Sequence, residues 1–389
     1  MTSRALRILH CPHNVGANPQ GLARAEREIG LDSWAVALEA HPFGYPIDEV
    51  LWGGSLGVAG RELSRIKLFA RALRGFDVIH FNFGQSCTPS LISFDRPSLS
   101  RRLSIPWRVA LPLVRWGIGL IELRDLPILR RLGKGIVVTF QGSDARQGDY
   151  CRTHFRISPA DEVGSEYFSD WSDRHKRYRI RMIDRYADRL YALNPDLLHV
   201  LPDRTEFLPY GHIDLADWRP IDSQGVEVNA EPLVVHVPSN QAMKGTKYVL
   251  AAVEDLRCRG IPFRFQLLEE GSHDEVRKAL QAADLVIDQL LCGWYGGLAV
   301  EAMALGKPVI CYLRDEDLGF LDPKMRASIP ILNATPQTIT SVLEASLAAG
   351  LDSLREAGAR SRAYVEAWHD PARIAKRLQR DYEAILQRT

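Results

Sequence analysis

The chain has 389 residues, of which 46% are hydrophobic and 25% charged, with a formal net charge of +1. This balance is typical of a globular protein and excludes an overall basic surface for nucleic acid. The six cysteines include no CxxC pair, and the amino terminus has no apolar signal segment, so neither a zinc site nor export is indicated. No run of roughly 18 apolar residues is present. We therefore expect a cytoplasmic protein of two domains.

The first half of the chain alternates short apolar runs with helical patterns. A strand is expected at 5–10, followed by a glycine-containing loop and then a helix that ends near Gly30. This order is typical of an α/β domain with a parallel sheet. The further elements expected in order are a strand at 33–39, a helix at 61–74, a strand at 77–83, a long helix at 105–132, a strand at 135–140, a helix at 171–187 and a strand at 187–194.

A second alternation follows the polar, aperiodic segment 214–231, which we interpret as an interdomain linker. The fold class is therefore α/β, with two Rossmann-like domains at 1–215 and 232–370 that face each other across a deep cleft, and a closing helix at 371–389. The elements expected here are strands at 232–238, 263–269, 284–290, 308–313 and 329–332, and helices at 245–259, 274–282, 296–306, 335–349, 352–367 and 371–387.

The strongest pattern is GWYGGLAVEAMALGKPVI at 293–310, directly after an expected strand. Gly296 and Gly297 begin a helix, and unobstructed backbone amides at a helix start suit a diphosphate. Glu301 lies about 1.4 turns further on, within reach of ribose hydroxyls. The alternative is that the glycines only turn the chain and Glu301 is a solvated helix residue. Tyr295 joins the donor-binding candidates.

A second pattern, HVPSNQAMKGTKYVLAAV, covers 236–253. A strand ends, a polar loop containing Asn240 follows, and Lys244 and Gly245 begin a helix. A lysine at this place neutralises the charge on a leaving phosphate. The alternative is an ordinary surface lysine.

The third pattern, TFQGSDAR, follows the strand expected at 135–140. Gln141, Asp144 and Arg146 are therefore candidates for a site at the carboxyl end of that strand, with Asp144 as a catalytic candidate. The alternative for Asp144 is a helix cap or turn former.

A fourth pattern is the loop HCPHNVGANPQG at 10–21. Gly16 allows a ligand to approach the backbone closely, and His13 and Asn14 are polar candidates for the acceptor side. The full GxGxxG fingerprint is absent, which argues against a dinucleotide-dependent dehydrogenase.

The segment 101–134 carries eight basic and two acidic residues, interleaved with tryptophans and aliphatic residues. This composition fits a helix that docks on an anionic membrane surface. A core helix with a solvated basic face is an equal alternative.

Together these patterns resemble the family 4 glycosyltransferases of the GT-B fold. The stretch EAMALGKPVI after GWYGG resembles their donor-site signature, MKGTKYVLAAV their KG loop, and TFQGSDAR their HGSDxR stretch. The ending RAYVEAWHDPARIAKRLQRDYEAIL resembles their last helices, which cross back to the first domain.

The resemblance implies a usually retaining transfer of a sugar from a nucleotide-diphosphate sugar, with no metal and no further cofactor. By position, Glu301 matches the second glutamate of the EX7E motif, which binds the ribose. Gly296 and Gly297 match the phosphate-contacting turn, Lys244 the lysine that steadies the diphosphate, and Gly16 the glycine loop that faces it.

Three positions depart from the family pattern. Gly293 stands where the first glutamate of EX7E is expected, and Asp288 is the nearby carboxylate that replaces it in our interpretation. Asn240 and Gln241 occupy the loop in which an arginine is usual. Gln141 replaces the histidine of HGSDxR.

These departures leave three functions open. A glycosyltransferase acting on a glycan or lipid-linked acceptor, in polysaccharide or glycolipid assembly, is the leading hypothesis. A partner-dependent or non-catalytic nucleotide-sugar-binding protein is the second, because both an acid and a basic group are altered. A nucleotide-sugar 2-epimerase is the third, since it shares the architecture. The location we expect is the cytoplasm, with peripheral attachment to the inner face of the membrane through 101–134.

Overall fold

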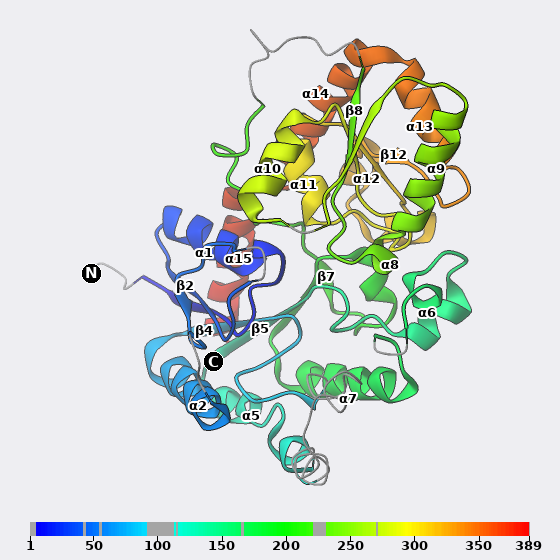
Figure 1. Cartoon of the computed structure of the whole chain (residues 1–389). Helices are drawn as coiled ribbons and strands as arrows, with labels where there is room; N and C mark the ends of the chain where they lie inside the picture. Colours follow the sequence, from blue (N-terminus) through cyan, green and yellow to red (C-terminus); the bar gives the residue numbers. More distant parts are fainter. Residues whose placement is uncertain are drawn as a thin grey trace. The chain divides into compact units, whose positions relative to one another are not determined.

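Two units make up the chain in a computed structural model (Figure 1). Unit 1 consists of Met1–Cys151, Gly164–Leu208 and Ala372–Thr389, and unit 2 of Arg152–Val163 and Pro209–Pro371. The segment Arg152–Val163 thus groups with unit 2, inside a stretch that the sequence analysis assigned to the first domain. The residues described by the structure are 5–41, 44–53, 57–91, 113, 116–164, 167–220, 231–269 and 271–388.

Unit 1 is built on a seven-stranded sheet in the order β3-β2-β1-β4-β5-β6-β7. Every paired strand is parallel, because a helix or loop returns the chain between successive strands. The strands are β1 (Arg7–Cys11), β2 (Asp32–Ala37), β3 (Glu49–Val50), β4 (Val78–Asn82), β5 (Gly135–Phe140), β6 (Arg189–Ala192) and β7 (Glu206–Phe207).

Helices cover both faces of this sheet. Apolar side chains of α2, α5 and α7 form one core with the strands, whereas α1 and α15 meet through the bond from Tyr382 to Glu26. All residues of β4 and β5 are buried, as expected for central parallel strands. The helices are α1 (Asn18–Glu28), α2 (Val58–Gly75), α5 (Asp125–Arg131), α6 (Gly148–His154), α7 (Asp170–Tyr186) and α15 (Pro371–Leu386), with the 3-10 turns η1 (Val15–Ala17) and η4 (Pro195–His199).

The long helix expected at 105–132 is interrupted. Leu123 has a φ of +60°, outside the helical range, and α5 begins only at Asp125. The carboxylate of Asp125 accepts bonds from Ser86 Oγ and Cys87 N, both at 2.8 Å, and thereby fixes the turn. Tertiary hydrogen bonds override the local helical pattern here.

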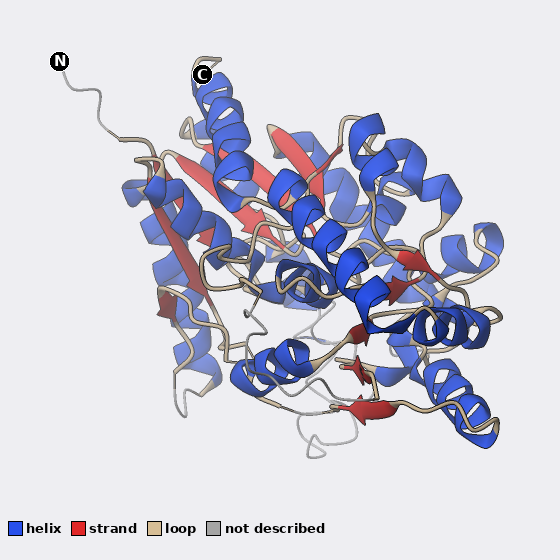
Figure 2. Cartoon of the chain, turned by 90° about the horizontal axis from the view of Figure 1, so that it is seen from above, coloured by secondary structure: helices blue, strands red, loops and turns tan. Residues whose placement is uncertain are grey.

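Unit 2 contains a parallel five-stranded sheet in the order β12-β11-β10-β8-β9. Its strands lie among helices, drawn red and blue in Figure 2. The strands are β8 (Leu233–His236), β9 (Arg264–Leu267), β10 (Leu285–Ile287), β11 (Val309–Cys311) and β12 (Leu332–Asn333). The helices are α8 (Gln241–Lys244), α9 (Thr246–Cys258), α10 (His273–Ala282), α11 (Gly297–Ala304), α12 (Pro323–Ser328), α13 (Ile339–Ala348) and α14 (Gly350–Trp368), with the 3-10 turns η3 (Pro159–Asp161) and η5 (Asp315–Phe320).

The core of unit 2 joins α9 and α13 to one face of the sheet, and α11 packs with α14. The contact between α11 and α14 is close enough to require a glycine. A Cβ added to Gly358 of α14 would lie 1.9 Å from the backbone oxygen of Gly306, just beyond α11. This packing fixes the end of α11 against α14.

Candidate functional site

The carboxyl edge of the unit 2 sheet gathers most of the predicted donor-binding residues. The loop after β8 carries Asn240 and Lys244, and the loop after β10 runs from Asp288 to the start of α11 at Gly297. A backbone bond of 3.0 Å from Leu290 N to Lys244 O joins the two loops. Open parallel sheets bind their ligands at this edge.

Asp288 connects the two parts of this edge that are best suited to phosphate. Its Oδ1 lies 2.7 Å from Lys244 Nζ, and its Oδ2 accepts a 2.7 Å bond from Gly296 N. Burial lowers the pKa of Lys244, but the Asp288 carboxylate outweighs burial and raises it, so the ammonium stays charged. A carboxylate thus holds the lysine and the helix-start amide together in the way an anionic ligand would.

Glu301 is buried and faces two imidazoles. Its Oε1 lies 3.4 Å from Nε2 of His212 and 3.6 Å from Nε2 of His273. Burial raises the pKa of Glu301, but the two imidazoles outweigh burial and lower it to about 2. The carboxylate is therefore ionised at neutral pH and is no solvated helix residue, so that alternative for Glu301 is wrong.

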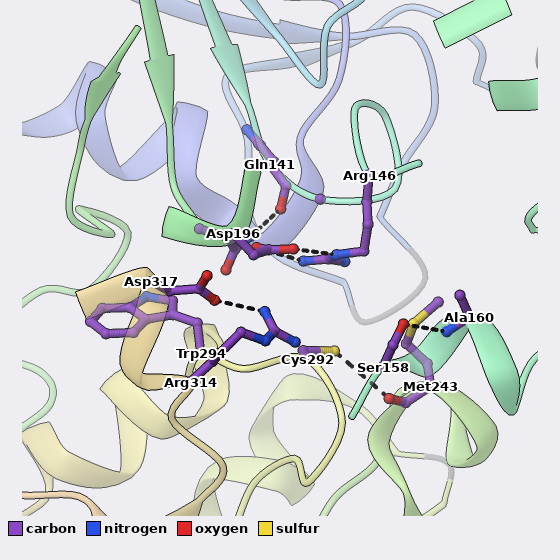
Figure 3. Close-up of polar contacts among 12 residues, drawn as sticks. Gln141, Arg146, Ser158, Ala160, Asp196, Met243, Cys292, Trp294, Arg314 and Asp317 are labelled. Atoms are coloured by element: carbon purple, nitrogen blue, oxygen red, sulfur yellow. Dashed lines mark hydrogen bonds and ion pairs between the residues drawn. The ribbon is translucent and has the colours of Figure 1, made fainter. Parts of the chain in front are cut away.

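The structure gives Gly293 a conformational and a steric role. Its φ is +81°, and a Cβ at this position would lie 2.5 Å from Arg314 NH1. Arg314 is itself buried: NH1 donates to Asp317 Oδ2 at 2.7 Å, NH2 donates to Ile157 O at 2.9 Å, and the guanidinium stacks on Phe155. Figure 3 shows Arg314 pointing to Asp317. A guanidinium therefore occupies the space beside Gly293 into which a side chain at that position would project.

Two further donor candidates bond within the protein. Asn240 Oδ1 accepts a 2.9 Å bond from Met243 N and so caps α8. The hydroxyl of Tyr295 is fully buried, 2.8 Å from that of Tyr364 and 2.9 Å from Nε2 of His369. In this arrangement both side chains stabilise the loops that carry Lys244 and Gly296.

In unit 1, Gln141, Asp144 and Arg146 follow β5 and are buried. Asp144 Oδ1 accepts bonds from Gln141 N at 3.1 Å and Gly142 N at 2.6 Å, which is the turn-forming arrangement. Gln141 donates through Nε2 to Asn82 Oδ1 at 3.3 Å.

Arg146 forms a two-bond ion pair with Asp196, with Nε to Oδ2 at 2.6 Å and NH2 to Oδ1 at 3.0 Å (Figure 3). Both side chains are almost inaccessible to solvent. Lys176 Nζ donates to the backbone oxygen of Arg146 at 2.7 Å. These bonds fix the position of Arg146, one of the four residues predicted for the acceptor side.

The loop after β1 contains the remaining predicted residues. Gly16 has a φ of +59° and no atom within 4 Å of its Cβ position. His13 Nε2 lies 2.8 Å from Gln85 Oε1, and burial lowers the pKa of His13 to about 4, so the ring is neutral at pH 7. The Nδ2 of Asn14 is buried without a hydrogen-bond partner within the described ranges.

Residues 101–112, 114 and 115 of the basic segment 101–134 lie outside the described residues, whereas 113 and 116–134 are described. Leu113, Trp116, Leu120 and Ile121 in this part are largely exposed, whereas Ile118 is buried. Across the part of the chain that the structure describes, no helix has the length and apolarity needed to span a bilayer.

Three residues escaped the sequence analysis: His212, His273 and Arg314. Each reaches the carboxyl edge of the unit 2 sheet from a segment outside the recognised patterns. A lone histidine or arginine in a loop carries no spacing signal. Only the fold reveals that these side chains contact Glu301 and the space beside Gly293.

No protein-family model matches the sequence, and no curated protein matches it at a significant level. The fold matches sucrose-phosphate synthase from Thermosynechococcus elongatus with a TM-score of 0.59 at 14% identity, covering 99% of this chain and all of that one. It also matches HepE from Anabaena, solved with UDP-glucose, with a TM-score of 0.57 at 11% identity over 98% of this chain and all of the other. The catalytic domain of starch synthase IV from Arabidopsis thaliana, bound to ADP and acarbose, gives 0.57 at 10% identity over 99% and 100% of the two chains. These structural neighbours are glycosyltransferases of the GT-B fold, and this chain has the same fold, as the sequence analysis predicted.

Proposed function

We propose that the protein transfers a sugar from a nucleotide-diphosphate sugar to an acceptor hydroxyl. The observation that carries the proposal is the cluster at the carboxyl edge of the unit 2 sheet, where Lys244 and the amide of Gly296 converge on one anionic group. The fold adds support, because HepE binds UDP-glucose and starch synthase IV binds ADP in structures of the same architecture.

In the proposed reaction, the bond between the anomeric carbon and the β-phosphate oxygen breaks, and a bond from the acceptor oxygen to that carbon forms. The acceptor proton passes to the departing diphosphate. Negative charge grows on the diphosphate during this step, and Lys244 together with the amides at the start of α11 stabilises it. We assign a retaining, metal-independent course, with the ribose near Glu301 and Asp288 holding Lys244 in place before the donor binds.

We place the acceptor on unit 1, at the loop that carries His13, Asn14 and Gly16. The neutral ring of His13 suits a hydrogen bond to a sugar hydroxyl. Gln141, Asp144 and Arg146 support this region through their internal bonds. A glycan or lipid-linked acceptor in polysaccharide or glycolipid assembly, reached at the cytoplasmic face of a membrane through 101–134, completes the proposal.

A second candidate is nucleotide-sugar binding without transfer. The observation in its favour is Gly293, beside which the Arg314 guanidinium stands with its partner Asp317. Where the resembling family has the first glutamate of EX7E, this chain has an Arg314–Asp317 ion pair whose charges cancel. Binding without turnover would support this second function.

The first experiment is a thermal-shift screen with UDP, GDP, ADP and their sugar conjugates. A ligand that binds only the folded protein raises the melting temperature. We expect a shift with one nucleotide family, lost in Lys244→Ala and kept in the control Lys247→Ala, whose ammonium pairs with Glu162 at the surface. No shift with any nucleotide contradicts the proposal.

A second experiment follows the donor itself. Donor consumption that requires an acceptor, with the sugar found on the acceptor, supports transfer. Donor isomerised without any acceptor indicates an epimerase, and a bound but unchanged donor indicates the binding function.

A further inference from the structure

His212 is the side chain at the start of α11 that has unsatisfied bonding capacity. It is buried, with only 2% of its side chain exposed. The ring lies against Gly297, the first residue of α11, since a Cβ built there would be 3.4 Å from Cε1 and 3.5 Å from Nε2 of His212. Neither ring nitrogen has a hydrogen-bond partner within the described part of the chain. Nε2 lies 3.4 Å from Glu301 Oε1, outside hydrogen-bond geometry.

A buried imidazole without hydrogen bonds is costly unless something else satisfies it. The first amides of an α-helix also have no partner inside the helix. His212 and the first turn of α11 therefore offer hydrogen-bond donors at the same place, and an anionic group is the ligand that accepts from both.

Three charged side chains lie around this place. Lys244 contributes one positive charge, whereas Asp288 and Glu301 contribute two negative charges. These three charges sum to −1, so an additional hydrogen-bond donor at the helix start helps an anionic diphosphate to bind.

We infer that His212 is a donor-binding residue whose imidazole, held by Glu301 against the first turn of α11, donates a hydrogen bond to the diphosphate of the nucleotide-sugar. This inference rests on the proposed function. Glu301 then acts on the diphosphate through His212, in addition to any contact with the ribose. His273 lies beside the same carboxylate oxygen but at the start of α10, and none of its atoms is within 4 Å of a Cβ built on Gly297, so it serves as an internal comparison.

The test compares His212→Gln with His273→Gln in the full chain. Each variant removes one imidazole from the same carboxylate, so a purely structural role predicts similar consequences for both. Dissociation constants are measured by calorimetry for the nucleoside diphosphate that shifts the wild type and for the matching nucleoside. An exposed histidine variant, His154→Gln, controls for the loss of an imidazole as such.

We expect His212→Gln to weaken diphosphate binding about tenfold or more while nucleoside binding is unchanged, because a charged hydrogen bond is lost. His273→Gln and His154→Gln should stay within about twofold of the wild type for both ligands. Equal weakening of nucleoside and diphosphate by His212→Gln, or no weakening at all, overturns the inference and leaves the proposed function intact. If His212→Gln does not fold, His212→Asn is measured in the same way. A wild type that binds no nucleotide overturns both.

Discussion

The carboxyl edges of the two sheets treat their buried charges differently. At the edge of the unit 1 sheet, Arg146 and Asp196 form two hydrogen bonds with each other, and the Asp144 carboxylate accepts hydrogen bonds from backbone amides. At the edge of the unit 2 sheet, Glu301 is buried beside His212, whose ring nitrogens have no hydrogen-bond partner among the described residues. Arg146, Asp196 and Asp144 thus form a closed structural network, whereas His212 has hydrogen-bonding capacity left for a ligand.

This difference separates stability from binding. A closed ion pair gives the protein rigidity and leaves nothing for a ligand. Unsatisfied donors cost stability in the free protein and become useful only when an acceptor arrives. We therefore expect substitutions in the Arg146, Asp196 and Asp144 network to act on folding, and substitutions at the unit 2 edge to act on both folding and nucleotide binding.

The largest effect is expected for Arg146→Ala. This change leaves the Asp196 carboxylate buried without its partner, which typically costs about 3–5 kcal/mol. Urea unfolding of the variant, beside Arg181→Ala at an exposed position of α7, measures the loss. Equal stability of the two variants would show that Arg146 is free to serve a ligand, and would break the comparison.

The second-largest loss of stability is expected for Glu301→Gln. The pKa of Glu301 is about 2, below the value near 4.5 in the unfolded chain, so its ionisation stabilises the fold by about 3 kcal/mol at neutral pH. Because the folded-state pKa is lowered, this contribution is complete above pH 4.5 and is lost as the pH falls from 4.5 to 2. Thermal melting of wild type and variant across this range should show a gap that closes toward pH 2. Glu356→Gln, exposed on α14, should show no such gap.

The fold follows from patterns that the chain carries locally. The run GIVVTF predicts a strand at 135–140, and β5 spans Gly135–Phe140. The two-residue strands β3 and β7 are too short to show any periodicity, and the sequence analysis did not find them. The break at Leu123 depends on the bond that Leu123 N donates to Thr88 Oγ1 and on the bond that the Asp125 carboxylate accepts from Cys87 N, which no local pattern reveals.

The site divides in the same way. The positions of Lys244, Gly296 and Glu301 relative to their strands follow from chain order alone, because strand ends meet at one edge. Their partners His212 and Arg314 come from elsewhere in the sequence. Long-range contacts of single side chains can be identified only from the fold. In the sequence, Gly293 therefore appears as the loss of a glutamate, whereas in the structure it leaves space for the Arg314 guanidinium.

Gly293→Ala tests that interpretation with a smaller effect. Any side chain at a φ of +81° costs about 1 kcal/mol, and the clash with Arg314 should add about 1–3 kcal/mol. Gly350→Ala is the matched control, because its φ is +80° and no atom lies within 4 Å of the added Cβ. Urea unfolding should therefore give a lower free energy of unfolding for Gly293→Ala than for Gly350→Ala. Equal losses would mean that Arg314 moves aside without cost, and that a carboxylate fits beside it.

The smallest effect is expected for Lys247→Met, three residues from Lys244, whose side chain is only 13% exposed. Lys247 pairs with Glu162 while 62% of its side chain is exposed, and ionic screening weakens such a pair. The melting temperature should stay unchanged, at low and at high salt alike. Lys244→Met should lower the melting temperature at both salt concentrations. The buried Asp288 carboxylate then loses the lysine and keeps the bond from Gly296 N. The two lysines therefore distinguish a charge that belongs to the candidate site from a charge on the surface. A Lys244→Met protein as stable as the wild type would show that Asp288 does not depend on its lysine.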